Sequence, residues 1–260
     1  MFYHDIDDLP TDVKPNHLIV ISSRDFEKAK QTRETGQFLL ESDKHFLVMP
    51  TQEESRQHSI IRPLYENNYL KENTILLLDK NPQNGNYYLP CEIVAERNIK
   101  MQMLHLPTLC QHLGAKRVSI VLNEKAEECR SMGIDIRTNV KGVNANTGTN
   151  YTNDQNSNNR TDLVTEFDGC DMDLAAAEQL MHKGIFDGND EIIAFYNSAK
   201  NQINRMRSQR LRCKTSQDIS KQLNMFANAN IPILQTIFNA DTKAQMKKLQ
   251  SLEIEYEVMF

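Results

Sequence analysis

This chain of 260 residues has few glycines and lacks the glycine-rich motifs that hold phosphate groups. It contains only nine glycines, and neither a Walker-type GxxxxGKS/T run nor GxGxxG occurs in it. Such motifs need glycine so that the backbone can approach a nucleotide's phosphates, and the sequence therefore argues against a nucleotide-cradling loop. The length allows a substantial core, arranged as one large domain or two smaller ones.

Long apolar runs are also missing, since none approaches the roughly 20 residues that a membrane-spanning helix needs. The first twelve residues, MFYHDIDDLPTD, hold four aspartates and no basic segment before an apolar run, which argues against a secretory signal peptide. The five cysteines are widely spaced without CxxC, a pattern typical of reduced thiols. We therefore expect a cytoplasmic protein without a stable transmembrane segment, and the sequence calls for no cofactor or metal.

The chain has no strong excess of charge of either sign. Its 30 basic and 35 acidic residues give a formal net charge of -5, which does not by itself require nucleic acid or an anionic membrane as partner. Hydrophobic residues make up 39% and charged residues 25%, as in an ordinary folded protein.

Hydrophobic patterning predicts a mixture of strands and helices along the whole chain. Strands are expected at 17–21, 45–49, 74–79, 116–124, 133–140, 161–167, 209–214 and 251–260. Helices are expected at 92–113, 171–184 and 189–206. Pro107 is expected to break or kink the first of these helices, and Gly114 to cap it in a left-handed conformation. The Asn-Gly pair between Asn81 and Pro90 predicts a hairpin or a tight loop.

This order of elements predicts an α+β fold, in which helices are inserted between the strands of an antiparallel sheet and the C-terminal strand closes the sheet. We divide the chain into a small N-terminal strand and helix region, residues 1–105, and an α+β domain, residues 106–260, although a single domain is also compatible with the pattern.

A long hairpin is expected at 134–167, with an asparagine-rich tip at 139–159. Its flanking strands share an apolar face, formed by Ile134, Ile136, Val140, Leu163 and Phe167. Its small polar residues, mixed with Thr and Val, resemble in composition the stem segments of pore-forming proteins. Each flank nevertheless supplies about half of the 9–11 residues that a membrane-crossing strand needs. A plain hairpin with a polar tip accounts for the same residues.

A second apolar segment at 225–238 is either core or a membrane-interacting segment. It is too short to span a bilayer as a helix, and burial in the core is the default. Its large apolar residues are Phe226, Ile231, Ile233, Leu234, Ile237 and Phe238.

The basic run RMRSQRLRCK is the strongest candidate for an anionic-partner site. Its cations are Arg205, Arg207, Arg210, Arg212 and Lys214, with no acid among them. On a strand, the last three project from one side and can meet the phosphate of nucleic acid or of anionic lipid head groups. The structural alternative is pairing with Glu253, Glu255 and Glu257 of the C-terminal strand.

Catalytic and metal sites have weaker candidates, each with a structural alternative. Ser22 or Ser23, after a strand, is a nucleophile or a helix cap. The acidic clusters EFDGCDMD (166–173) and FDGNDE (186–191) are a cation site or helix caps. The spacing of His105, Cys110 and His112 is compatible with part of a zinc site. The alternative is a helix that buries the cysteine and leaves the histidines partly exposed.

We draw three functional hypotheses from these observations. The first is a non-enzymatic protein that acts by macromolecular contact or self-assembly, and its sharper version is a conditional membrane-acting effector that uses 134–167 and 225–238. The second is a nucleic-acid-binding protein that uses Arg205 to Lys214. The third is an enzyme of unknown class whose site is assembled from distant residues.

Overall fold

The computed structural model describes residues 2–3, 8–9, 15–31, 45–79, 87–121, 163–168, 171–200, 206–215, 217, 219–221, 224, 247 and 253–260. These residues form two compact units: Met1–Val94 with Gln222–Lys247, and Ala95–Lys221 with Lys248–Phe260. The division falls inside helix α5 (Cys91–His112). The predicted boundary between residues 105 and 106 also lies inside this helix, and it stays a prediction.

The first unit contains a five-stranded mixed sheet. Its strands are β1 (Phe2–Tyr3), β2 (His17–Ile21), β3 (Phe46–Val48), β4 (Thr74–Asp79) and β5 (Tyr87–Pro90). The spatial order is β1-β3-β2-β4-β5, in which β3 pairs with β1 and β2 in parallel and the other pairs are antiparallel. The strands predicted at 17–21, 45–49 and 74–79 are therefore present, and β4 and β5 form the expected antiparallel pair.

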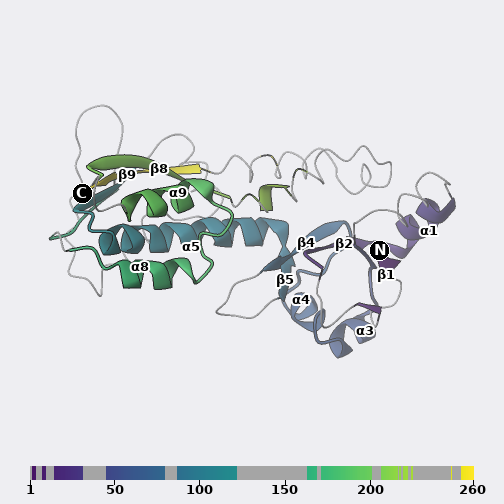
Figure 1. Ribbon diagram of the computed structural model, residues 1–260. Coiled ribbons are helices and arrows are strands. Elements are labelled where there is room, and N and C mark those ends of the chain that lie inside the picture. Colours follow the sequence, from purple (N-terminus) through teal and green to yellow (C-terminus); the bar gives the residue numbers. More distant parts are fainter. Residues whose placement is uncertain are drawn as a thin grey trace. The chain divides into compact units, whose positions relative to one another are not determined.

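The short helices of this unit are α1 (Ser23–Gln31), α3 (Gln52–Gln57) and α4 (Arg62–Glu66), drawn beside the sheet strands in Figure 1. Two of them, α1 and α3, begin at side chains that satisfy free backbone N–H groups, whereas α4 begins with a proline in its first turn. Thr51 and Glu54 form a reciprocal capping box at the start of α3. The apolar side chains of the sheet and of α4 share one buried cluster, which includes Leu18, Val20, Leu47, Leu64 and Leu76.

The second unit is built on a four-stranded antiparallel sheet. Its strands are β6 (Arg117–Val121), β7 (Leu163–Glu166), β8 (Ser208–Lys214) and β9 (Glu253–Met259), in the spatial order β7-β6-β9-β8. β9 therefore lies inside the sheet, between β6 and β8. Its alternating sequence buries Ile254, Tyr256 and Val258 on one face and leaves the glutamates on the other, as the strict alternation predicts.

Helices α5, α8 (Leu174–Met181) and α9 (Asp190–Ala199) complete this unit, and Figure 1 draws α5 between the other two. Gly114 follows α5 with a φ of 85°, which confirms its left-handed cap. Pro107 was predicted to break or kink the helix, and of these two outcomes the break is wrong, because α5 continues through Pro107. The missing N–H of a proline destabilises a helix, but Met103, Leu106, Leu109 and Cys110 around it are fully buried, and their packing offsets this loss.

The α+β class is thus confirmed, with antiparallel sheets and helices between strands. Of the predicted hairpin 134–167, only 163–167 belong to the described residues, and there β7 pairs with β6. Within the described ranges, no helix combines the length and the apolar character needed to cross a membrane.

Candidate functional site

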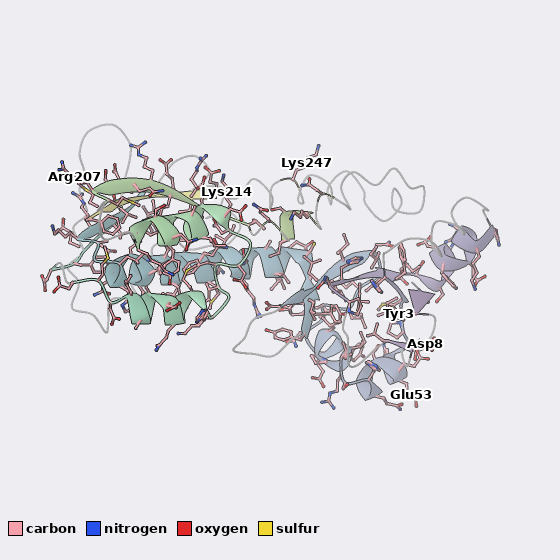
Figure 2. All side chains as sticks on the ribbon, in the orientation of Figure 1. Tyr3, Asp8, Glu53, Arg207, Lys214 and Lys247 are labelled. Atoms are coloured by element: carbon pink, nitrogen blue, oxygen red, sulfur yellow. The ribbon has the colours of Figure 1, made fainter. Side chains whose placement is uncertain are left out.

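The basic segment predicted as a binding site forms β8, an edge strand of the four-stranded sheet. Arg210, Arg212 and Lys214 project from its outer face, whereas Leu211 and Cys213 between them are buried. Arg207 lies exposed just before the strand, and Figure 2 labels Arg207 and Lys214 at the two ends of this segment. Arg205 lies outside the described residues. The structure therefore gathers most of the predicted cations along one strand.

Carboxylates of β9 and α9 accompany these cations. Arg210 lies 3.6 Å from Glu255 and 3.9 Å from Glu257. Lys214 lies 3.8 Å from Glu253 and also 3.8 Å from Glu191. The charge pairing considered as the structural alternative is therefore present. Pairs as exposed as these each contribute about 0–1 kcal/mol, so they explain the arrangement of the charges better than they explain the stability of the fold.

Arg210 is the most exposed of the three cations on β8. Its side chain is 69% exposed, compared with 49% for Arg212 and 43% for Lys214. Both of its ion pairs are longer than a hydrogen bond, whereas Arg212 reaches Glu191 at 3.1 Å. The guanidinium of Arg210 thus faces solvent with its donors free of close carboxylate contacts from the described residues.

The outer backbone edge of β8 is closed at one residue by the start of α9. The Arg212 amide donates a hydrogen bond to Glu191 Oε2 at 3.0 Å. The Arg212 carbonyl accepts one from Asn189 Nδ2 at 3.5 Å. These two side chains occupy the backbone groups that an edge strand otherwise presents to another strand.

The same edge is open toward the beginning of the strand. The Arg207 carbonyl accepts from the Phe260 amide at 3.0 Å, so the backbone of residue 207 faces β9. Backbone direction alternates along an antiparallel strand, and Ser208 and Arg210 therefore face outward as Arg212 does. Among the described residues, none donates to or accepts from these outward groups at Ser208 and Arg210.

A network of buried amides fixes α9 against α5 and β8. Asn189 Nδ2 donates to Gln102 Oε1 at 2.8 Å, and Gln102 Nε2 donates to Asn98 Oδ1 at 2.9 Å. Asn189 Oδ1 also accepts from the Ile192 amide and so caps α9. Asn189 and Gln102 are both buried, and a buried amide is costly unless it is hydrogen-bonded. This network determines where Glu191 meets the edge of β8.

Three of the other candidates contain helix caps, and in the 186–191 cluster the cap is Asn189, which begins α9. Ser22 Oγ accepts from the Asp25 amide at 3.0 Å and donates to Asp25 Oδ2 at 2.7 Å. Asp173 accepts from the Ala176 amide and caps α8. The geometry at Ser22 and Asp173 is thus that of the capping alternatives. No group of three or more His, Cys, Asp or Glu residues suited to a metal ion occurs in the described ranges.

The predicted half zinc site is divided between the core and the surface of α5. Cys110 is fully buried, and burial raises the pKa of its thiol. His105 is half-buried, and burial together with the nearby charge of Lys183 lowers the pKa of its imidazole. Zinc binds the thiolate form of cysteine, which the surroundings of Cys110 disfavour.

The described cysteines are expected to resist thiol reagents in the folded protein. Cys91, Cys110 and Cys213 are buried free thiols, and burial raises the pKa of each. A raised pKa keeps the thiol protonated at pH 8, and the reactive thiolate is then scarce. Labelling with a maleimide followed by peptide mass spectrometry will show these positions modified only after denaturation. Rapid labelling of any of them at pH 8 without denaturant would contradict this expectation.

A ring cluster in the first unit was not predicted from the sequence. Tyr3 Oη and His45 Nδ1 are hydrogen-bonded at 2.8 Å, and their rings stack with centroids 5.9 Å apart. The His17 ring lies edge-on to His45 at 5.6 Å. These contacts join strands β1 and β2 to the residue before β3. These contacts cannot be predicted from local sequence patterns, because the three residues come from separate segments of the chain.

The structure describes few residues of the two predicted membrane or assembly segments, 134–167 and 225–238. Phe167 is half-buried and its amide donates to the Lys116 carbonyl, and Leu163 pairs with Ile120 in the sheet. The remaining residues of these predictions lie outside the described residues, and both segments stay predictions.

Comparison with known proteins gives no family assignment, since no family model, curated protein or solved structure matches this chain. The functional inference therefore rests on the edge of β8. Sequence reasoning identified its cations and placed Asn189 and Glu191 in the 186–191 cluster, but it missed Ser208 and the contacts of Asn189 and Glu191 with β8, which define the open and closed parts of the edge. The alternation of charges in β8 and β9 indicated that these two strands pair, but no sequence signal placed the start of α9 at the other edge of β8.

Proposed function

We propose that this protein acts without catalysis, by contact with another protein, and that the contact surface is the outer edge of β8. The observation that carries this proposal is that no described residue bonds to the outward backbone groups of Ser208 and Arg210, next to the exposed guanidinium of Arg210. An open strand edge is a common means by which one protein chain recognises an extended segment of another.

A protein partner fits this surface better than nucleic acid or lipid does. A phosphate-rich partner gains affinity from cations that release counterions, and it is repelled by carboxylates. Here Glu191, Glu253, Glu255 and Glu257 lie within 4.0 Å of the cations of β8. A strand-like partner, in contrast, gains most from backbone hydrogen bonds and needs only a side chain that complements Arg210.

Fluorescence anisotropy with three kinds of probe will test this proposal near physiological salt. The probes are a pool of ten-residue peptides with alternating glutamate and apolar residues, single-stranded and duplex DNA, and vesicles containing phosphatidylserine. We expect saturable binding to members of the peptide pool. Binding to DNA alone, with affinity falling steeply as salt rises, would instead support the nucleic-acid hypothesis. No binding to any peptide of the pool would overturn the proposal.

The experiment with vesicles also tests the hypothesis of a conditional membrane-acting effector, which depends on 134–167 and 225–238. Release of a trapped dye from the anionic vesicles will report insertion. We expect no release with the untreated protein, because contact through β8 does not require a membrane. Release together with an absence of peptide binding would favour the membrane-acting version.

A further inference from the structure

We propose that the partner is an extended segment that adds to the outer edge of β8 as a fifth strand, with a carboxylate opposite Arg210. This inference rests on the proposed function and gives its binding mode and the chemistry of the partner. It follows from the backbone direction of β8, from the position of α9 and from the pairing of β8 with β9.

The backbone of β8 defines where an added strand can lie. In the part of the chain that the structure describes, no group bonds to the outward backbone of Ser208 and Arg210, whereas the outward groups of Arg212 are taken by Glu191 and Asn189. An added strand therefore pairs with the beginning of β8 and ends before Arg212, where α9 blocks it. The site is thus short and bounded, and its affinity depends on few hydrogen bonds and on the side chains near them.

β9 shows which side-chain pattern suits β8. In the register of the sheet, Glu257 lies opposite Arg210, Glu255 opposite Arg212 and Glu253 opposite Lys214, with apolar residues between them. Directly opposed side chains project to the same face of a sheet, so an acid opposite Arg210 on the other edge meets the same guanidinium. The exposed donors of Arg210 can then bind a carboxylate closely from the open side.

The same charges argue against a second copy of β8 as the occupant. Two β8 edges paired with one another place Arg210 of each chain on the same face of the joined sheet, and the Ser208 to Arg210 segment of the other copy offers neither guanidinium a carboxylate. Like charges that lie opposite one another across strands are destabilising. An acidic strand at this edge would instead place β8, whose exposed face is basic, between two acidic strands, itself and β9.

The test uses the full chain and a fluorescent peptide with the sequence of residues 251–260, SLEIEYEVMF. Ser208→Pro removes an outward amide and leaves the amides that bond to β9, as is tolerated on edge strands. We expect this variant to bind the peptide at least about tenfold more weakly, because it loses a hydrogen bond and gains a steric block. Ser208→Ala keeps the amide and is expected to bind as the unchanged protein does.

Two further measurements make the result independent of the folding of the proline variant. Arg210→Gln is expected to weaken binding several-fold, and a peptide with lysine in place of each glutamate is expected not to bind. Hydrogen exchange followed by NMR should show that peptide slows exchange of the Ser208 and Arg210 amides, with the Gln209 and Leu211 amides as protected as before.

The outcomes separate this inference from the proposed function. If the peptide binds but protection of Ser208 and Arg210 does not change, strand addition is wrong and contact through side chains stands. If Gln209 and Leu211 lose protection, the peptide has displaced β9, and the inference is also overturned. If neither this peptide nor any member of the pool binds, both proposals fail. Concentration-dependent dimerisation that Ser208→Pro abolishes would replace the acidic partner with a second copy.

Discussion

Replacing Asn189 with leucine is expected to lower the free energy of unfolding by about 2–4 kcal/mol. The side chain of Asn189 caps α9 through the Ile192 amide, and its loss leaves that amide without a partner. It also leaves the buried Gln102 Oε1 and the Arg212 carbonyl without their donor. Leucine is similar in size, so the loss comes from the missing hydrogen bonds and not from a cavity. Urea unfolding followed by circular dichroism will measure the change.

Two controls show whether the amide network is the cause. Glu191→Gln keeps an acceptor near β8 and removes only half-exposed ion pairs, so we expect a change below about 1 kcal/mol that shrinks with added salt. The double variant with Gln102→Leu should lose less stability than the sum of the two single variants, because leucine at both positions leaves fewer buried groups unpaired. Strict additivity of the two changes would contradict direct coupling between Gln102 and Asn189.

The predicted elements correspond to local signals, which is why the sequence reveals them. Ile254, Tyr256 and Val258 alternate with glutamates, and this period of two is sufficient to predict β9 and its buried face. Asp173 and Gly114 likewise mark the start of one helix and the end of another. Each of these features depends on residues within a few positions of one another.

The order of the strands has no such local signal. β9 lies between β6 and β8, and its pairing with β6 joins residues as far apart in the chain as Arg117 and Met259. Alternation indicates that a strand has one buried face, but not which strand lies beside it. The parallel pairing of β3 with β1 and β2 was missed for the same reason.

The candidate site was predicted in part. Features that depend on neighbouring residues were predicted, and those that depend on packing between distant segments were not. The cations of β8 are consecutive alternate residues, so their common face is evident from the sequence alone. The closing of the edge by Asn189 and Glu191 depends on the packing of α9 against β8, which sequence patterns do not specify. The open edge at Ser208 becomes visible only when the closed part is known.

Removing the first half of α5 is expected to unfold the second unit. Both the predicted boundary and the observed division of the chain lie inside this helix. Ile99, Gln102 and Met103 are fully buried and belong to the second unit, but they precede residue 106. A fragment of residues 106–260 lacks them and leaves Asn189 without its amide partner. Removing a buried side chain as large as Ile or Met costs about 2–5 kcal/mol, and a domain's whole stability is about 5–15 kcal/mol.

We therefore expect residues 91–260 to fold and residues 106–260 not to fold. Thermal unfolding followed by circular dichroism should give a cooperative transition for 91–260 and none for 106–260. The matched control is a fragment of residues 91–260 with Lys100→Ala, which changes the same helix at a half-buried position and should still unfold cooperatively. If 106–260 unfolded cooperatively and gave dispersed amide resonances, the first half of α5 would not be required by the second unit's core, and the boundary between residues 105 and 106 would describe the folding units.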